Sequence, residues 1–123
     1  MKTNEAVRAL AALAQETRLG AFRLLVQAGS AGLPAGRIAE RLDVALPTLS
    51  FHLKELSQAG LVTSRSESRY VFYAANFERM AALMSYLTQN CCRGMPEECL
   101  TTLETALAGC CTARPEPTER KSP

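Results

Sequence analysis

All five cysteines of this 123-residue chain lie in its last third. They form two adjacent pairs, Cys91-Cys92 and Cys110-Cys111, with Cys99 between the pairs. Three thiolates without a nearby imidazole suit a soft, three-coordinate acceptor, and trivalent arsenic and antimony fit because they favour a pyramid of three sulfurs. Zinc prefers four ligands, so it would need a sulfur from the second pair. That second pair can bind as well, complete a site across a dimer, or only decorate the tail.

The set that we favour as ligands is Cys91, Cys92 and Cys99. Adjacent cysteines in a regular helix point about 100° apart, so they converge on one ion only where the helix ends or distorts. Gly94 and Pro96 supply such an end. The loop between the Cys91-Cys92 pair and Cys99 lets Cys99 fold back as a third thiolate. The alternative is that the three cysteines pack as small hydrophobic side chains at a helix end.

Length, composition and charge indicate the compartment of the cell in which such thiols would act. The length fits one domain, and 47% hydrophobic residues fit a folded one. Charges interrupt residues 1–19, so no signal peptide is visible, and no run of about 18 apolar residues predicts a membrane span. We therefore expect a cytoplasmic protein, in which an odd number of cysteines favours thiols or metal ligands over disulfides. The net charge of only +2 means that a case for nucleic acid must rest on local arrangement.

The elements that must position the cysteines are mostly helical. Apolar spacing predicts helices over 4–14, 17–28, 34–42, 46–59 and 77–90, with one more short helix over 100–107. Two segments rich in β-formers, 61–65 and 70–74, predict a two-stranded hairpin joined by residues 66–69. The expected fold class is thus mainly α with a β-hairpin wing (α+β). We divide the chain into a DNA-binding and dimerisation domain (1–90), a cysteine-rich sensing segment (91–111) and a disordered, proline-rich tail (112–123).

The middle of the chain has the plan of a winged helix-turn-helix. A short helix, the tight link Asp43-Val-Ala-Leu46, a longer helix and a hairpin follow one another. In this plan the exposed N-terminal half of the longer helix enters the major groove of DNA. The residues predicted to contact DNA there are Pro47, Thr48, Ser50, Phe51, His52 and Lys54, and those in the wing are Arg65 and Arg69.

Taken singly, these side chains are ordinary. A lone histidine such as His52 is more often structural than functional. Lys54 and Arg69 would be ordinary solvated charges in most proteins, and Arg65 can protect a hairpin edge. Their placement on one predicted surface is what indicates DNA binding.

The segment Ser50-Phe-His-Leu-Lys-Glu-Leu-Ser-Gln-Ala-Gly-Leu-Val62 resembles the ArsR/SmtB family of metal-responsive repressors. The segments Thr17-Arg-Leu and Arg69-Tyr-Val-Phe-Tyr73 resemble its opening helices and its wing, and the likeness covers roughly residues 4 to 90. The resemblance implies a homodimeric winged helix-turn-helix repressor of double-stranded operator DNA, with the first and last domain helices as the dimer interface. The chain departs from the family at Ala45-Leu46-Pro47, where many members have a polar cap, and this leaves the operator sequence open.

The resemblance also bears on sensing. One branch of the family binds metal through a Cys-x-Cys on the helix before the recognition helix, but residues 34–41 hold no cysteine. Another uses Asp and His on the last helix, but the only histidine here is His52. Asn90-Cys-Cys-Arg-Gly94 followed by Cys99 resembles the arsenic-responsive branch with a C-terminal site. It implies release from DNA when As(III) or Sb(III) binds, control of metalloid-resistance genes, and no organic cofactor.

Other interpretations remain open at this point. The thiols can be a redox sensor that forms a disulfide, or a zinc or cadmium sensor. The chain can also be a thiol enzyme or a metal buffer, or a winged-helix regulator whose cysteines are incidental. No catalytic triad, phosphate loop or paired-carboxylate site is visible in the sequence, so we expect no enzyme.

Overall fold

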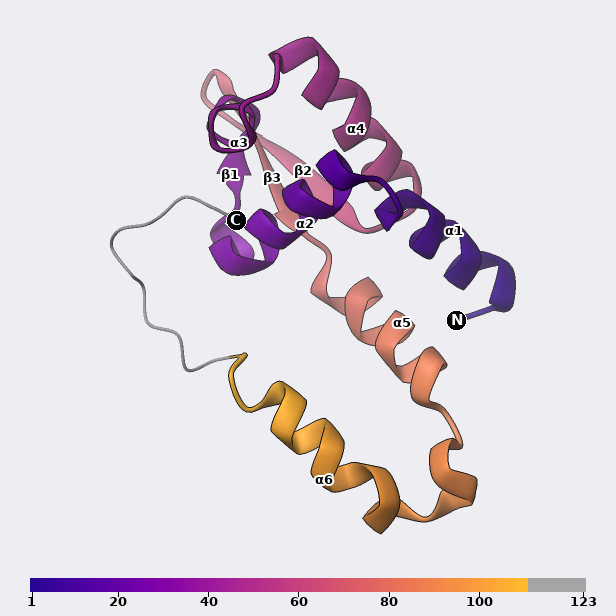
Figure 1. Ribbon diagram of the computed structural model, residues 1–123. Helices are drawn as coiled ribbons and strands as arrows, with labels where there is room; N and C mark the ends of the chain where they lie inside the picture. The colour runs from indigo at the N-terminus through magenta and orange to yellow at the C-terminus, as the bar shows by residue number, and fades with distance from the viewer. Residues whose placement is uncertain (111–123) are drawn as a thin grey trace.

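The computed structural model describes residues 1–110, without the side chains of Pro96, Glu98 and Cys99. Cys111 and the predicted disordered tail (112–123) lie outside the described residues. The elements are α1 (Thr3–Leu13), α2 (Glu16–Ala28), the 3-10 turn η1 (Gly29–Ala31), β1 (Leu33–Pro34), α3 (Ala35–Leu42), α4 (Leu46–Gln58), β2 (Val62–Glu67), β3 (Tyr70–Ala75), α5 (Phe77–Thr88), the 3-10 turn η2 (Cys91–Gly94) and α6 (Pro96–Leu107) (Figure 1).

The core lies where α2, α3 and α4 meet the base of the sheet. Its largest fully buried side chains are Leu25, Ile38, Leu49, Leu53, Leu56 and Leu61. In α4 the buried leucines recur every three or four residues, which places them on one helix face, as the sequence predicted. Burying each such leucine contributes roughly 1.5–3 kcal/mol, so this face fixes how α4 sits on the body. The predicted winged helix-turn-helix architecture is confirmed.

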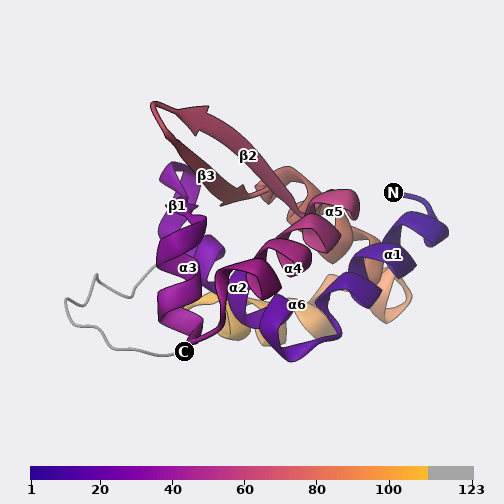
Figure 2. The same cartoon turned by 90° about the horizontal axis from the view of Figure 1, so that it is seen from above.

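The wing is a three-stranded antiparallel sheet of order β1-β3-β2, not a two-stranded hairpin. The hairpin of β2 and β3 pairs Val62 with Ala75 and Glu67 with Tyr70, and it extends away from the helices (Figure 2). The extra strand β1 pairs Leu33 with Tyr73. The helix expected to begin at Pro34 begins at Ala35 instead, because Pro34 is extended (φ −72°, ψ 153°) and pairs with β3.

The chain reaches β1 through two glycines with nearly the same left-handed backbone. Gly32 has φ +73° and Gly29 has φ +72°. A Cβ added at Gly32 would lie 2.2 Å from the Tyr73 carbonyl oxygen, whereas a Cβ at Gly29 would meet nothing within 4 Å. Gly32 is therefore required both by its backbone conformation and by the close approach of β3.

We predict that Gly32→Ala lowers the free energy of unfolding by about 3 kcal/mol, and Gly29→Ala by only about 1 kcal/mol. Both variants carry the same backbone strain, so the difference between them measures the clash with β3. Urea unfolding followed by circular dichroism gives both values. Equal losses would show that the backbone near Tyr73 gives way to a methyl group.

Helices α5 and α6 extend away from the wing and α3 (Figure 1). Helix α5 packs beside α1, where the Thr3 and Tyr86 hydroxyls share a hydrogen bond. At the start of α1 the backbone N–H of Lys2 donates to the Glu5 carboxylate (2.9 Å), and this hydrogen bond lowers the pKa of Glu5. Helix α6 packs against η2. None of the helices within residues 1–110 is long and apolar enough to cross a membrane.

Candidate nucleic-acid interface and cysteine segment

Helix α4 presents a polar half to solvent. It begins after Ala45, which is extended (φ −68°, ψ 145°) and gives no side-chain cap, and Pro47 occupies its first turn. Leu49 and Leu53 face the core, and the exposed side chains of this half are Leu46, Pro47, Thr48, Ser50, Phe51 and Lys54. Five of the six helix residues predicted to contact DNA therefore lie exposed on one helix. Their contact with DNA stays a prediction.

His52 is the exception, because its side chain is half-buried. Its Nδ1 lies 3.2 Å from Nη1 of Arg18, a residue of α2. The neighbouring Phe51 ring meets the imidazole edge-on, with ring centres 5.5 Å apart. Arg18 was not among the residues predicted to contact DNA, although it lies in the Thr17-Arg-Leu segment that resembles the family. Nothing in the sequence indicates that residues 34 positions apart are in contact.

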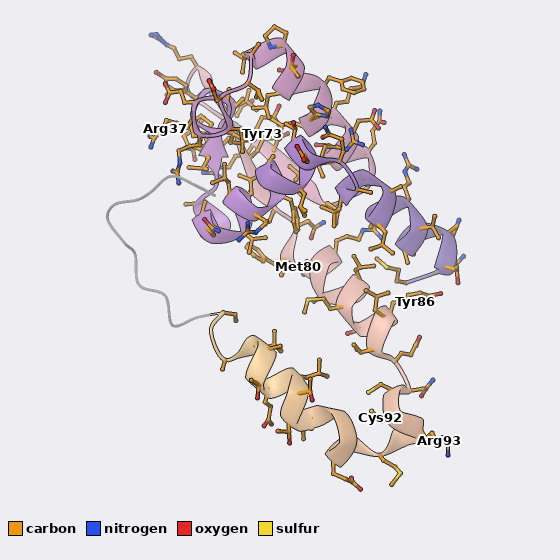
Figure 3. All side chains as sticks on the ribbon, viewed as in Figure 1. Arg37, Tyr73, Met80, Tyr86, Cys92 and Arg93 are labelled. Carbon is orange, nitrogen blue, oxygen red and sulfur yellow. The ribbon has the colours of Figure 1, made fainter. Side chains whose placement is uncertain are left out.

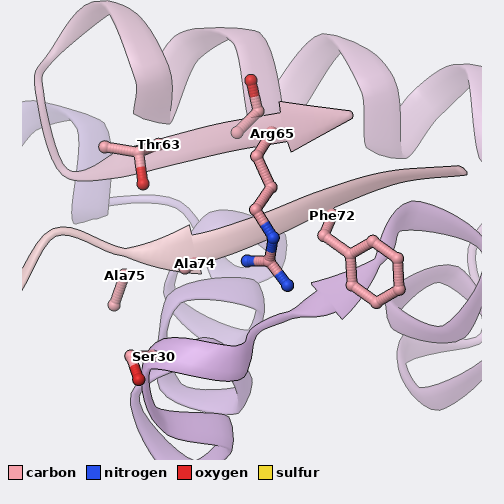
Figure 4. A pocket seen from close by; sticks show the side chains of 7 residues that line it. Ser30, Thr63, Arg65, Phe72, Ala74 and Ala75 are labelled. Carbon is pink, nitrogen blue, oxygen red and sulfur yellow. The ribbon is translucent and has the colours of Figure 1, made fainter. Parts of the chain in front are cut away.

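The two wing arginines lie in different settings. Arg65 Nη2 donates to the Ala31 carbonyl (3.0 Å), its Nε donates to the Glu67 carboxylate (3.1 Å), and its guanidinium lies over the Phe72 ring, 5.0 Å from the centre. Figure 4 shows the Arg65 side chain crossing the sheet at a pocket also lined by Ser30 and Thr63. Arg65 therefore connects the wing to η1, which is a structural role.

Arg69 lies at the wing tip and is exposed. The turn there depends on Ser68 in the left-handed region (φ 57°). Tyr70 and Val71 beside it are also exposed, although the sequence indicated no role for them. Of the two wing arginines, Arg69 is thus the better placed to reach a DNA backbone.

The first cysteine pair lies in an irregular turn. Helix α5 ends at Thr88, two residues earlier than predicted, because Gln89 turns out of the helix (ψ 133°) and Asn90 is left-handed (φ 60°). Cys92 and Arg93 are left-handed too (φ 54° and 55°). The helix therefore ends before the cysteine pair, as the sequence predicted, but Gln89 and Asn90 make this end rather than Gly94 and Pro96.

The cysteine segment lies far from the exposed N-terminal half of α4. Figure 3 shows Cys92 and Arg93 at the turn between α5 and α6, at the opposite end of the molecule from α3 and α4. Cys91 and Cys92 are half-buried, and Cys110, beyond α6, is exposed. Cys99 lies in the first turn of α6, which packs back against the turn that holds the pair.

Within the side chains that the structure describes, no three His, Cys, Asp or Glu groups are placed to hold a metal ion. The side chain of Cys99 is not among them. The site of Cys91, Cys92 and Cys99 therefore stays a prediction, as does any part played by Cys110 and Cys111.

Sequence comparison finds transcription regulators. Residues 13–65 match a family model described as a helix-turn-helix domain. The transcriptional activator HlyU of Vibrio cholerae is 33% identical over 89 residues, which cover 72% of this chain and 80% of HlyU. The HTH-type transcriptional regulator YceK of Bacillus subtilis is 38% identical over 58 residues, which cover 47% of this chain and only 57% of YceK.

Comparison of folds agrees. An ArsR-like transcriptional regulator from Rhodococcus sp. RHA1 superposes with a TM-score of 0.63 at 26% identity, covering 84% of this chain and 92% of that one. The homodimeric winged helix-turn-helix domain of Mb0332 from Mycobacterium bovis, a possible ArsR-family regulator, gives 0.59 at 26% identity, covering 85% and 84%. The similar proteins are regulators of transcription, not enzymes.

Proposed function

Because this chain belongs to the ArsR-type family of winged helix-turn-helix transcriptional regulators, we propose that it is a homodimeric repressor that trivalent arsenic or antimony releases from operator DNA. The inducer would bind the thiolates of Cys91, Cys92 and Cys99. The observation that carries this proposal is the cysteine pair in the turn that follows α5, where Asn90, Cys92 and Arg93 have left-handed backbones. A repressor of this kind acts on the chromosome, so we place it in the cytoplasm, controlling metalloid-resistance genes.

The dimer would form through α1 and α5. Two large apolar side chains on each helix are exposed in the single subunit: Val7 and Leu10 on α1, and Met84 and Leu87 on α5. Apolar side chains gathered on two adjacent helices mark an interaction surface. The homodimeric Mb0332 domain supports a second copy of the chain as the occupant.

Sensing requires a link from the cysteine turn to the DNA-reading helix. Helix α5 supplies it, because the turn follows its C-terminal end and its N-terminal end is tied to the short segment that follows α4. Asn76 Nδ2 donates to the Gly60 carbonyl (3.0 Å), and the Asn76 backbone N–H donates to the Leu61 carbonyl (2.8 Å). A dimer reads two half-sites about 34 Å apart, so a small shift of α5 across the interface spoils the spacing of the two α4 helices.

Fluorescence anisotropy on promoter DNA tests the proposal. The protein is kept in excess reductant and titrated with arsenite, with zinc and cadmium in parallel. We expect arsenite to weaken DNA binding by about 5–150-fold, the usual range of coupling between two sites. Release under strict reduction argues against a redox switch. Tight DNA binding that arsenite leaves unchanged would contradict the proposal.

Two substitutions in α4 should separate the reading of bases from the binding of phosphates. Lys54→Gln should weaken binding to every DNA sequence and reduce the slope of log affinity against log salt by about 0.9, the value of one lost phosphate contact. Ser50→Ala should weaken binding to the operator by about fivefold or more, with little change on unrelated DNA.

Ser57→Ala is the matched control, since Ser57 is exposed on the same helix outside its N-terminal half. The measurement is anisotropy at several salt concentrations on operator and scrambled duplexes. Equal behaviour of the Ser50 and Ser57 variants would move the reading surface away from the start of α4.

A further inference from the structure

Arg18 joins three helices of the DNA-binding domain. Its backbone N–H donates to the Gln15 side chain (2.9 Å) at the start of α2. Its Nε donates to the carbonyl of Ala12 (2.7 Å) near the end of α1. Its Nη1 lies 3.2 Å from Nδ1 of His52 in α4. The guanidinium is part-buried and its Nε is held by the Ala12 carbonyl, so it meets His52 from a defined position.

The chemistry of this contact decides where the imidazole carries its proton. A guanidinium has only donors, so the Arg18 N–H must donate and His52 Nδ1 must accept. An imidazole with an unprotonated Nδ1 is neutral and carries its proton on Nε2. The Arg18 contact therefore selects one of the two neutral tautomers of His52.

We infer that Arg18 is a positioning residue, which holds His52 with Nε2–H as a hydrogen-bond donor toward operator DNA. This inference rests on the proposed function, because it needs α4 to read DNA. The two nitrogens flank the Cε1 atom and their hydrogen-bonding directions diverge, so Nε2 is directed away from Arg18. Residues on both sides of His52 in the helix, Phe51 and Lys54 among them, are exposed. The Phe51 ring lies edge-on to the imidazole, with ring centres 5.5 Å apart.

A donor at this place has definite partners. The phosphate oxygens and, in the major groove, purine N7, guanine O6 and thymine O4 accept hydrogen bonds, whereas adenine N6 and cytosine N4 donate them. His52 would thus accept nothing from DNA and donate one hydrogen bond. A purely structural histidine would contribute packing but no donor.

Nitrogen-15 NMR of the labelled imidazole in the full chain, without DNA, tests the tautomer. At about pH 8, where histidine is neutral, we expect the shifts of an Nε2–H tautomer in the parent protein. We expect a mixture of tautomers in Arg18→Met and no change in Arg23→Met, a control at an exposed arginine of the same helix. An Nδ1–H tautomer in the parent, or no preference, would overturn the inference.

Two substitutions of His52 then test the donor by anisotropy on operator DNA. His52→Gln places an amide donor near the position of Nε2, whereas His52→Asn keeps an acceptor near Nδ1 but has no donor at the outer edge. We expect the Asn variant to lose about tenfold in affinity, as one hydrogen bond would give, and the Gln variant to retain most of it. Equal affinities of the Asn variant and the parent would overturn the role of His52.

The two proposals fail in different ways. If the parent chain binds no DNA, the proposed function is overturned and the role of His52 with it. If the parent binds DNA but the tautomer is wrong, only the role of Arg18 is overturned. Thermal melting of each variant identifies any loss of affinity that comes from unfolding.

Discussion

A variant with Cys91→Ser, Cys92→Ser and Cys99→Ser will bind operator DNA as tightly as the parent, and arsenite will no longer release it. Serine keeps the shape of cysteine but replaces a soft sulfur with a hard oxygen, which trivalent arsenic binds poorly. The turn that holds the pair lies at the opposite end of the molecule from α4, so DNA affinity should not change (Figure 3). The response of about 5–150-fold expected of the parent should fall to none.

The matched control for this variant is Cys110→Ser combined with Cys111→Ser. Cys110 is exposed beyond α6, and we expect this double variant to respond to arsenite as the parent does. Both variants are titrated on the same promoter duplex under the same reductant. Release of the triple variant by arsenite would refute the three-cysteine site and make Cys110 and Cys111 the next candidates.

Arsenite binding should also depend on pH in a definite direction. Arsenite is As(OH)3 near neutral pH, so each As–S bond forms as a thiol proton leaves with one hydroxide of arsenite as water, and no net proton is released to solvent. The affinity for arsenite should therefore change little while the thiols are protonated, and it should fall as the pH rises above about 8.5, where thiolates would have to take up protons on binding.

The coupling between arsenite and DNA should be reciprocal. Operator DNA should weaken arsenite binding by the same factor by which arsenite weakens DNA binding.

The parts of the fold that burial dictates were predictable from the sequence. Leu49, Leu53 and Leu56 show helical spacing because one face of α4 is removed from water, and the structure buries all three. The wing strands were predicted within two residues of their true ends, since both segments are rich in β-formers and residues 66–69 between them favour a turn. Strand β1 was missed because two residues are too few to show a period.

What depends on a single backbone dihedral or on a distant pair was not predictable. The end of α5 is set by Gln89 and by the left-handed Asn90, and the apolar pattern does not register the sign of φ. The contact of Arg18 with His52 spans two helices, and the contact of Arg65 with the Ala31 carbonyl spans 34 residues. The sequence shows that such side chains are polar but not what they touch. The exposed site residues on α4 were predictable because the buried face of the helix determines which of its residues face solvent.

The substitution Leu87→Glu in α5 will convert the dimer to a monomer and lower operator affinity by about 100-fold or more. Leu87 is 58% exposed in the single subunit, so a charge there disturbs little within the protomer. Across the proposed interface the same carboxylate would be buried without a partner, which is strongly unfavourable. A dimer gains about 10²–10⁴-fold from engaging two half-sites together, and a monomer loses that gain.

Leu19→Glu is the matched control, because Leu19 is 45% exposed and lies on α2, which is not one of the two helices of the proposed interface. We expect the Leu19 variant to stay dimeric and to bind DNA. Sedimentation equilibrium gives the mass of each variant, and anisotropy gives its affinity. A dimeric Leu87 variant with unchanged affinity would exclude this part of α5 from the interface. A monomeric variant that still binds the full operator as tightly as the parent would instead show that one α4 helix suffices, and the coupling through half-site spacing would then have no basis.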